Sequence, residues 1–337
     1  MIGGVRVRAN RKSTRREFIT LLGGAAAAWP RAGRAQRPEQ MRRVGVLMGL
    51  DANDPEGQSE AGALKQGFQK LGWIEGRNLQ FEYYWSGGDA NRIQASAKAL
   101  VSATVEVIVA RSTPAVAALV KETRTIPIVF SYVVDPVGSG FVQSFARPGG
   151  NVTGFQTYEF TIAGKWLQLL TEVAPAVRRV GLIHNPMTAP PEFLRELERL
   201  APSAPVQLVA MRVHNPEEIN ATIAGIAGEP GGGLIIMPDI FNDANHPQIV
   251  ALAAKHALPA VYTHRFDDGL VCYGPDLPDL FQRVASYVDR ILRGEKPSEL
   301  PVQAPTKYEL VVNLKIANAL GLRIPPNLIA IADELIQ

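Results

Sequence analysis

Short apolar runs alternate with longer segments of helical periodicity along almost the whole chain. The run from Arg43 to Leu50, RVGVLMGL, is apolar at nearly every position, as in a strand that is buried on both faces of a parallel sheet. From Gly57 to Leu71 the apolar residues instead recur every three or four positions, which predicts an amphipathic helix. Such alternation of strands and helices is typical of βαβ units and a parallel sheet.

The same alternation predicts two successive series of elements. The first series continues with strands at 78–85, 105–110 and 126–132 and helices at 90–102 and 114–123. The segment RPGGNVTG, rich in glycine and proline, then interrupts the pattern at 147–154. The second series contains helices at 159–173, 190–200, 216–227 and 246–257 and strands at 178–184, 206–211, 233–238 and 259–262. The predicted fold class is α/β, with two doubly wound parallel-sheet sandwiches and a ligand cleft between them.

The C-terminal part of the chain is too short to form a third domain. It contains a predicted helix at 279–292 and a predicted strand at 308–313. We expect these elements to complete the two sandwiches, so that the chain crosses between them several times, through a multi-strand hinge near residues 154, 273 and 304. The expected domains are lobe 1 at 42–153 plus 274–303, and lobe 2 at 155–273 plus 304–337.

The first 35 residues have the layout of an export signal. TRREFIT at 14–20 fits a twin-arginine signature, and an apolar run that is too short to span a bilayer follows it. Small residues at Gly33 and Ala35 provide a candidate cleavage site. We therefore expect a twin-arginine signal peptide at 1–35, cleavage near Ala35 and a periplasmic protein. An amphipathic first helix is the alternative, but two glycines and a proline in this segment disfavour it.

Without residues 1–35, the chain has a negative net charge. The whole chain has 35 Lys and Arg against 32 Asp and Glu, and residues 1–35 contain eight of the basic residues and one of the acidic ones, which leaves 27 against 31, a net charge of −4. We therefore expect no nucleic-acid partner. Cys272 is the only cysteine, so neither an intrachain disulfide nor a lipid anchor is expected. The expected mature protein is a monomer that does not insert into the membrane.

The chain has no motif typical of an enzyme or a cofactor site. It lacks G-x-S-x-G, a P-loop, and G-x-G-x-x-G after the first strand. The histidines have no metal-ligand spacing with cysteine or glutamate. They are His184, His214, His246, His256 and His264. We therefore expect no catalytic activity, no cofactor and no metal site.

Four stretches together resemble the periplasmic solute-binding proteins of ABC importers, which have the type I periplasmic-binding fold. They are RREFITLLGGAAAAWP, IPIVFSYVVDPVGSGFVQSFARPGGNVTG, YGPDLPDLFQRVASYVDRILRGEKPSELPVQAPTKYELVVNLKIANALGL and RIPPNLIAIADELI. More narrowly, the chain resembles the branch that includes tryptophan- and phenylalanine-binding members. The resemblance implies capture of a small molecule by hinge closure and delivery to an ABC permease in the inner membrane. A periplasmic ligand-sensing subunit of a signalling receptor with the same fold is the alternative.

Candidate binding residues of lobe 1 lie at predicted strand ends, where open α/β sheets hold ligands. Ser112 and Thr113 precede a proline at the start of a predicted helix, whose N–H groups and dipole suit a carboxylate. Helix capping alone is the alternative. Ser131 ends the fourth predicted strand, and Asp135 follows it, where its alternative role is to form a turn or to cap a helix at 137–145.

Candidate binding residues of lobe 2 centre on Asp239, which follows a predicted buried strand. We expect its carboxylate to pair with a ligand ammonium, and the resemblance to amino-acid-binding members supports this role. Its alternative role is that of a helix N-cap or a solvated loop acid. The remaining expected contacts are Phe155, Thr157, Asn185 and Tyr262. The expected ligand is an amino acid or a related small carboxylate.

Overall fold

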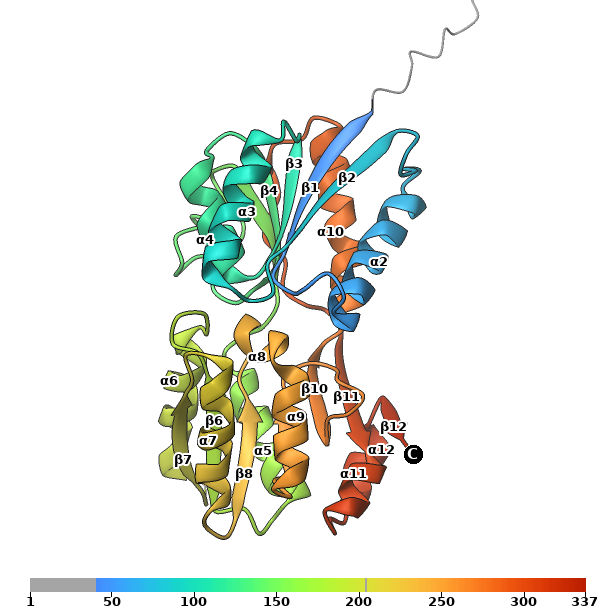
Figure 1. Cartoon of the computed structure of the whole chain (residues 1–337). Coiled ribbons are helices and arrows are strands. Elements are labelled where there is room, and N and C mark those ends of the chain that lie inside the picture. Colours follow the sequence, from blue (N-terminus) through green and yellow to red (C-terminus); the bar gives the residue numbers. More distant parts are fainter. Residues whose placement is uncertain (1–40, 204) are drawn as a thin grey trace, which may run out of the picture. The chain divides into compact units, whose positions relative to one another are not determined.

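The computed structural model describes residues 41–203 and 205–337, and the segment 41–337 forms one compact unit with two separate sheets (Figure 1). The expected signal peptide at 1–35 lies outside the described residues. The predicted α/β class is confirmed, because both sheets are built from parallel βαβ units with helices on their faces.

The first sheet has the strand order β2-β1-β3-β4-β5, and all its neighbouring strands are parallel. Its strands are β1 (Arg42–Met48), β2 (Leu79–Trp85), β3 (Val107–Arg111), β4 (Ile128–Val133) and β5 (Val152–Gln156). Because all five strands are parallel, their carboxyl ends lie together at one end of the sheet.

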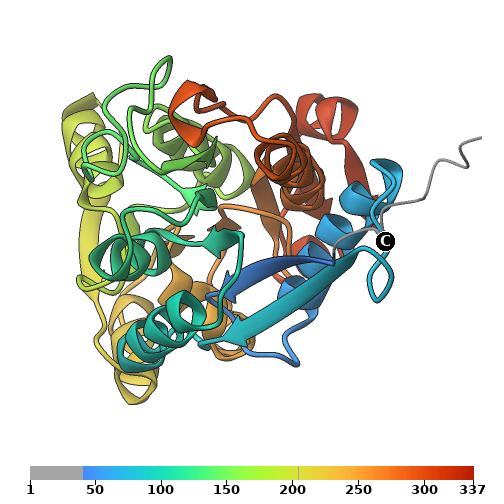
Figure 2. The same cartoon turned by 90° about the horizontal axis from the view of Figure 1, so that it is seen from above.

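Helices cover both faces of the first sheet, as the view from above shows (Figure 2). They are α2 (Pro55–Lys70), α3 (Ala90–Ser102), α4 (Thr113–Glu122) and α10 (Leu277–Leu292). In β1, Val46 belongs to the core beneath α2 and α10, whereas Leu47 belongs to the core beneath α3 and α4. Successive strand side chains point to opposite faces, so a strand covered on both faces is apolar throughout.

The second sheet has the order β12-β11-β10-β9-β8-β6-β7. Its strands are β6 (Arg179–His184), β7 (Gln207–Arg212), β8 (Gly232–Ile236), β9 (Ala260–Tyr262), β10 (Val271–Pro275), β11 (Tyr308–Asn313) and β12 (Glu334–Ile336). The pair β10–β11 is antiparallel, and the other described pairs are parallel.

The helices of the second sheet also lie on both faces. They are α5 (Ile162–Val173), α6 (Pro191–Leu200), α7 (Pro216–Ala227), α8 (Ile240–Ala244), α9 (His246–Lys255), α11 (Leu314–Ala319) and α12 (Pro326–Ile331). Trp166 on α5 is fully buried and its Nε1 donates a hydrogen bond to the Tyr273 carbonyl at 2.8 Å, which satisfies the polar atom of the ring. Helices α7 and α9 pack over the opposite face, against Ile183 of β6.

Several short elements are not predicted by the sequence periodicity, namely β5, β10, β12, α8, α11 and α12. These elements have at most six residues each, and β5 begins inside the segment 147–154 that interrupts the pattern. Among the described residues, no helix combines the length and the apolar character needed to cross a membrane.

The chain passes between the two α/β sandwiches in three places. It does so between β5 and α5, between β10 and α10, and between the 3-10 turn Pro297–Glu299 and β11. The first and third connections pair with each other, because Gln156 N donates to Gln303 O at 2.8 Å and Gln303 N donates to Gly154 O at 3.1 Å. We call the first sheet with α2, α3, α4 and α10 lobe 1, and the second sheet with the other helices lobe 2.

Gly154 allows β5 to lie against β4 beside this connection. A Cβ at this position would lie 2.6 Å from Phe130 N and closer still to Phe130 O, and the φ of Gly154 is +153°. We expect Gly154→Ala to lower the free energy of unfolding by more than about 1 kcal/mol in chemical denaturation. A Cβ at Gly62 in α2 would have no neighbouring atom within 4 Å, so Gly62→Ala is the matched control and should raise stability by about 0.5–1 kcal/mol. Equal stability of Gly154→Ala and the parent would contradict the close approach of β4 and β5.

Candidate functional site

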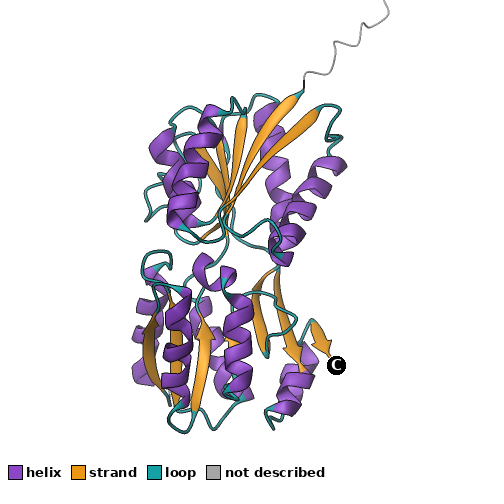
Figure 3. Cartoon of the chain, viewed as in Figure 1, coloured by secondary structure: helices purple, strands orange, loops and turns teal. Residues whose placement is uncertain are grey.

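The two lobes meet through the loops that follow their parallel strands, drawn in teal between the two sets of orange strands (Figure 3). Gly49, after β1, approaches Ile240 of α8 so closely that a Cβ would lie 2.6 Å from the Ile240 Cδ1 atom. Gly88, after β2, approaches Ala244 of the same helix, and a Cβ on this glycine would lie 3.1 Å from the Ala244 Cβ. Helix α8 of lobe 2 therefore packs directly against the strand-end loops of lobe 1.

Arg111, the last residue of β3, is fully buried at this interface and is paired with three acids. Its Nε donates to Glu60 Oε2 at 2.6 Å and one terminal nitrogen donates to Glu56 Oε1 at 2.8 Å. Both terminal nitrogens lie 3.4 Å from Asp243 Oδ2 of lobe 2. The guanidinium also lies over the Tyr132 ring, 4.2 Å from its centroid.

The two glutamates reach Arg111 because they are four residues apart on α2 and so lie on one face of that helix. Asp54 caps α2 by accepting a hydrogen bond from Gly57 N at 3.0 Å, which sets the start of the helix and places Glu56 in its first turn.

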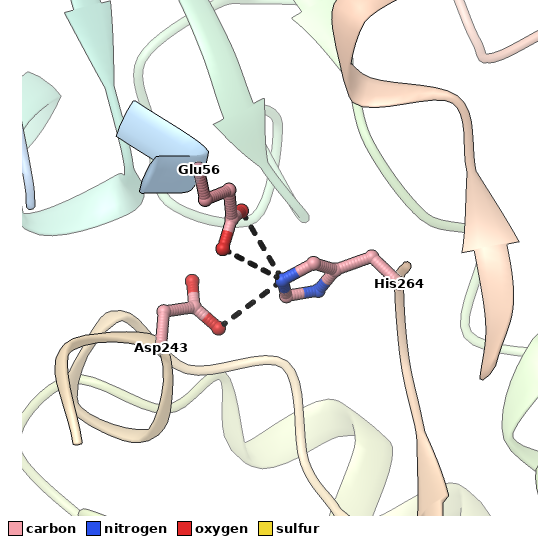
Figure 4. Close-up of side chains that lie close together, drawn as sticks. All are labelled: Glu56, Asp243 and His264. Atoms are coloured by element: carbon pink, nitrogen blue, oxygen red, sulfur yellow. Dashed lines mark hydrogen bonds and ion pairs between the residues drawn. The ribbon is translucent and has the colours of Figure 1, made fainter. Parts of the chain in front are cut away.

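His264, in the loop after β9 of lobe 2, faces two of these acids, Glu56 and Asp243 (Figure 4). Its Nε2 lies 3.2 Å from Glu56 Oε1 and 3.7 Å from Asp243 Oδ1. Its Nδ1 lies 3.5 Å from the Tyr132 hydroxyl and 3.4 Å from the Tyr158 hydroxyl. The imidazole is thus enclosed by groups from both lobes.

Burial and pairing move the pKa values of this cluster in different directions. Burial would raise the pKa of Glu56, but His264 and Arg111 outweigh it and lower this pKa to about 2. Burial raises the pKa of Glu60 to about 8 despite Arg111, and it raises the pKa of Asp243 to about 6 despite His264. For His264, burial would lower the pKa, but Glu56 and Asp243 outweigh it and raise the pKa. The acids therefore differ in charge at neutral pH although they share one arginine.

Two grooves with walls from both lobes flank the cluster. The first, of about 440 Å³, is lined in lobe 1 by Thr113 and Asp135 and in lobe 2 by Thr188. The second, of about 890 Å³, contains Glu56, Glu60, Asp243 and His264 in its wall and has further carboxylates at its mouth. Those further carboxylates belong to Asp54, Asp267, Asp268, Asp276 and Glu309.

The predicted binding residues of lobe 1 lie close together at the ends of β3 and β4. Ser112 caps α4, its Oγ accepting from Ala115 N at 3.4 Å, and its own N–H donates to Ser131 O at 3.0 Å. Ser131 is fully buried and its Oγ has no partner among the described residues. Thr113 and Asp135 both line the 440 Å³ groove. The Asp135 carboxylate accepts a hydrogen bond from Gly138 N at 2.7 Å and so caps a turn. The helix expected at 137–145 is not present.

Among the predicted residues beyond β4, Asp239 and Asn185 contact each other. Asp239 is the N-cap of α8, where its carboxylate accepts from Asn185 N at 2.7 Å, from Thr188 Oγ1 at 2.5 Å and from Phe241 N at 3.0 Å. Burial raises the pKa of Asp239 to about 7, although the hydrogen bonds from Thr188 and Asn185 act to lower it.

The other three predicted residues, Phe155, Thr157 and Tyr262, are buried and do not line the 440 Å³ groove. Phe155 packs against the Tyr287 ring, and Tyr262 packs against His246 and Phe266. Thr157 is fully buried, and its Oγ1 has no partner among the described residues.

The central cluster of Glu56, Glu60, Arg111, Asp243 and His264 is not among the residues predicted from the sequence. One local signal is present, since Arg111 is a cation at the end of the apolar run VIVAR. A buried arginine needs acidic partners, and the acids four residues apart at the start of α2 are candidates. No local signal indicates that Asp243 and His264 of lobe 2 join them.

Comparison with known proteins gives the chain a family. Residues 51–336 match the family described as ABC transporter substrate binding protein. A protein named tyrosine-binding protein from Clostridioides difficile (strain R20291) is 26% identical over 272 residues, which are 77% of this chain and 76% of the relative.

Solved structures give the same result for the fold. An ABC domain in complex with L-Trp from Streptococcus pneumoniae superimposes with a TM-score of 0.80 at 22% identity, covering 88% of this chain and 100% of that one. A conserved domain protein from Vibrio cholerae O1 biovar eltor superimposes with a TM-score of 0.79 at 26% identity, with the same coverage. The resemblance seen in the sequence and the type I periplasmic-binding fold are thereby confirmed. The chain belongs to the ABC transporter substrate-binding proteins, a family that binds solutes and does not catalyse reactions.

Proposed function

We propose that the protein captures an amino acid with an aromatic side chain, or a related small carboxylate, and delivers it to an ABC permease in the inner membrane. The names of two similar proteins support this ligand class, since one is called tyrosine-binding and the other contains L-Trp. In this chain, the observation that carries the proposal is the groove of about 440 Å³ with one wall from each lobe. Its volume is within the range of about 300–1,000 Å³ that is usual for small-molecule sites.

This groove offers separate places for the charged and the apolar ends of a zwitterion. Thr113 and the first turn of α4 form one wall, where backbone N–H groups and the helix dipole suit a carboxylate. Asp135 and Glu192 provide negative charge for an ammonium group. The apolar lining suits a ring, and it consists of Ala90, Ile93, Pro114, Ala117, Ala118, Met187, Ala189, Pro190 and Pro191.

The backbone is strained at Ser112, next to Thr113 of the groove wall, and at Tyr132 near the end of β4. Ser112 has a φ of +100° and Tyr132 has a φ of +56°, and neither is a glycine. Each such residue costs of order 1–3 kcal/mol, and residues of this kind concentrate at binding sites. The strain supports a site at the ends of β3 and β4, where Ser112 and Ser131 also lie.

For Asp239 the contacts support a positioning role. Its carboxylate accepts three hydrogen bonds from the protein, and Thr188, which is one of the donors, lines the groove. Asp239 itself is not part of the groove wall. We propose that it holds the loop from Asn185 to Thr188 in place, and that direct pairing with the ligand ammonium is the alternative.

The proposed function includes closure of the two lobes around the solute and export of the protein to the periplasm. Three chain connections join the lobes, so the lobes can rotate about them when a ligand binds, as in other hinge closures. The export signal expected at 1–35 would direct the protein to the periplasm, where substrate-binding proteins of importers meet their permeases.

Aromatic L-amino acids should stabilise the protein. At a hundredfold excess over the dissociation constant, a bound ligand adds about 2.7 kcal/mol to the free energy of unfolding, so tryptophan, tyrosine or phenylalanine should raise the melting temperature. Thermal-shift assays would compare these with glycine, small carboxylates and hexoses, and X-ray scattering would test for a smaller radius of gyration on binding. A shift with hexoses alone would refute the proposed ligand class.

Thr113→Ala should weaken binding of the best ligand about fivefold, because about 1 kcal/mol is typical for the loss of one neutral hydrogen bond. Thr171→Ala is the matched control, since its hydroxyl bonds to Leu167 O within α5 and does not line the groove. Calorimetric titrations of both variants would measure the effect. Equal affinity of Thr113→Ala and the control would remove Thr113 from the site.

Asp239→Asn tests the state of the buried carboxyl through pH. The pKa of Asp239 is about 7 in the folded protein, whereas its ordinary value is 3.8. Between pH 3.8 and pH 7, therefore, Asp239 is protonated in the folded state and ionised in the unfolded state. The parent should therefore lose stability relative to Asp239→Asn as pH rises through this window, by about 2–3 kcal/mol from pH 5 to pH 7. Denaturation of both proteins at the two pH values measures this difference. If the stability difference between the parent and Asp239→Asn is the same at both pH values, the carboxyl group of Asp239 is already ionised at pH 5. Direct pairing with a ligand ammonium group requires this ionised form.

A further inference from the structure

We propose that Glu56, Asp243 and His264 form a divalent-metal site that bridges the two lobes, and that Zn²⁺ is the ion that fits its donors. This site is distinct from the 440 Å³ groove and does not depend on the identity of the solute. Glu56 comes from α2 of lobe 1, whereas Asp243 of α8 and His264 come from lobe 2 (Figure 4).

The spacing of the donor atoms is that of ligands around one ion. The three atoms lie within 4.8 Å of one another, with 3.3 Å between His264 Nε2 and Glu56 Oε2 and 3.7 Å between His264 Nε2 and Asp243 Oδ1. Tetrahedral ligands at zinc distances of about 2.0–2.2 Å are about 3.3–3.6 Å apart. Direct charge-assisted hydrogen bonds are shorter, at about 2.7–2.9 Å, so the spacing favours an ion between the donors.

Outer contacts orient each donor toward the shared point. Arg111 donates to Glu56 Oε1 and to Asp243 Oδ2. Each carboxylate therefore has a second oxygen, Glu56 Oε2 and Asp243 Oδ1, at 3.3 and 3.7 Å from His264 Nε2. Hydrogen bonds that fix ligating carboxylates in this way are a regular feature of metal sites.

The hydroxyls of Tyr132 and Tyr158 lie beside Nδ1, on the other side of the imidazole from the carboxylates. The Tyr158 hydroxyl donates to Thr263 O at 3.0 Å, so its oxygen is free to accept a hydrogen bond from His264 Nδ1 at 3.4 Å. Without an ion, a proton on Nε2 can pair with Glu56 at 3.3 Å. When Nδ1 carries the only proton, the lone pair of Nε2 faces the two carboxylates, and a metal ion can take the place of the Nε2 proton.

An unpartnered buried oxygen in the same wall is an independent sign of a bound cation. Glu60 is fully buried, and its Oε1 accepts no hydrogen bond from the described residues. The residue lines the 890 Å³ groove together with the three donors. This oxygen can therefore accept a hydrogen bond from a water bound to the ion.

A bound ion would change the protonation of the cluster, because metal binding releases protons from its ligands. Once His264 and Glu60 have lost their protons, the three carboxylates, Arg111 and a divalent ion sum to zero charge. One imidazole and carboxylates are donors that suit zinc, whereas magnesium prefers oxygen ligands alone.

The test is metal binding by the full chain in the absence of any amino acid. After treatment with a chelator, calorimetric titration with Zn²⁺ should show one site, with no comparable site for Mg²⁺. Glu56→Gln and His264→Gln should each weaken Zn²⁺ binding more than about 100-fold, because loss of a direct ligand exceeds the usual effect of losing an outer contact. His264→Cys keeps a ligand, so it should retain Zn²⁺ and give a thiolate–metal absorption band with Co²⁺.

Two controls separate this site from surface binding. Asp267→Asn removes an exposed carboxylate at the mouth of the same groove and should leave the Zn²⁺ affinity unchanged. His214→Gln removes the exposed pair with Glu218 on α7 and should also have no effect. Melting curves show whether each variant is folded, and Zn²⁺ should raise the melting temperature of the parent but not that of Glu56→Gln.

The metal site is refuted if the parent binds no Zn²⁺, if Glu56→Gln and His264→Gln bind it as the parent does, or if only His214→Gln loses it. Failure of this proposal leaves solute binding intact, because amino acids are titrated separately in the presence of chelator.

Discussion

A guanidinium group without access to water determines the arrangement of the region between the lobes. Arg111 is fully buried, and a buried cation is tolerated only when its partners are close and well oriented. Those partners come from α2 and from α8, so the position of β3 ties together a helix of each lobe. The cap at Asp54 sets the start of α2 and so places Glu56 beside Arg111, and the close approach of α8 to Gly49 places Asp243 beside it.

The contacts of Arg111 also divide unequally between the lobes. Its short hydrogen bonds, 2.6 and 2.8 Å, go to Glu60 and Glu56 within lobe 1, whereas its contacts with Asp243 of lobe 2 are 3.4 Å long. Separation of the lobes would therefore break the weaker contacts and leave the cation neutralised on its own lobe. Because Ser112 follows directly, the strand end that carries the proposed solute site keeps its geometry when the lobes separate.

The fold could be predicted from the sequence better than the site for a physical reason. Periodicity is local, so β1 and α2 could be predicted from the residues they contain, while β10 and α8 are too short to show a period. Strand ends could also be predicted, and Thr113, which follows the end of β3, lines the 440 Å³ groove. The pairing of Arg111 with Asp243 joins residues 132 positions apart, and no pattern within either segment contains it.

For the same reason, the spacing of the histidines does not indicate the contact between His264 and Glu56. His264 faces Glu56 from 208 positions away, and only the folded chain brings them together. Asp239, which local reasoning assigns to the ligand with a helix N-cap as the alternative, caps α8 through Phe241 N, and its further bonds from Asn185 and Thr188 come from a distant segment.

The packing of α10 against α2 has a consequence for biosynthesis. Leu64 and Phe68 of α2 belong to the same core as Phe281 and Val284 of α10, more than 200 residues later in the chain. The sheet of lobe 2 likewise receives β11 and β12, which follow α10 in the chain. The face of the first sheet under α2 and α10 cannot be fully buried before α10 has been synthesised, and the second sheet is incomplete before β11 and β12 have been synthesised. Apolar surface that stays exposed during this interval favours aggregation of the incomplete chain.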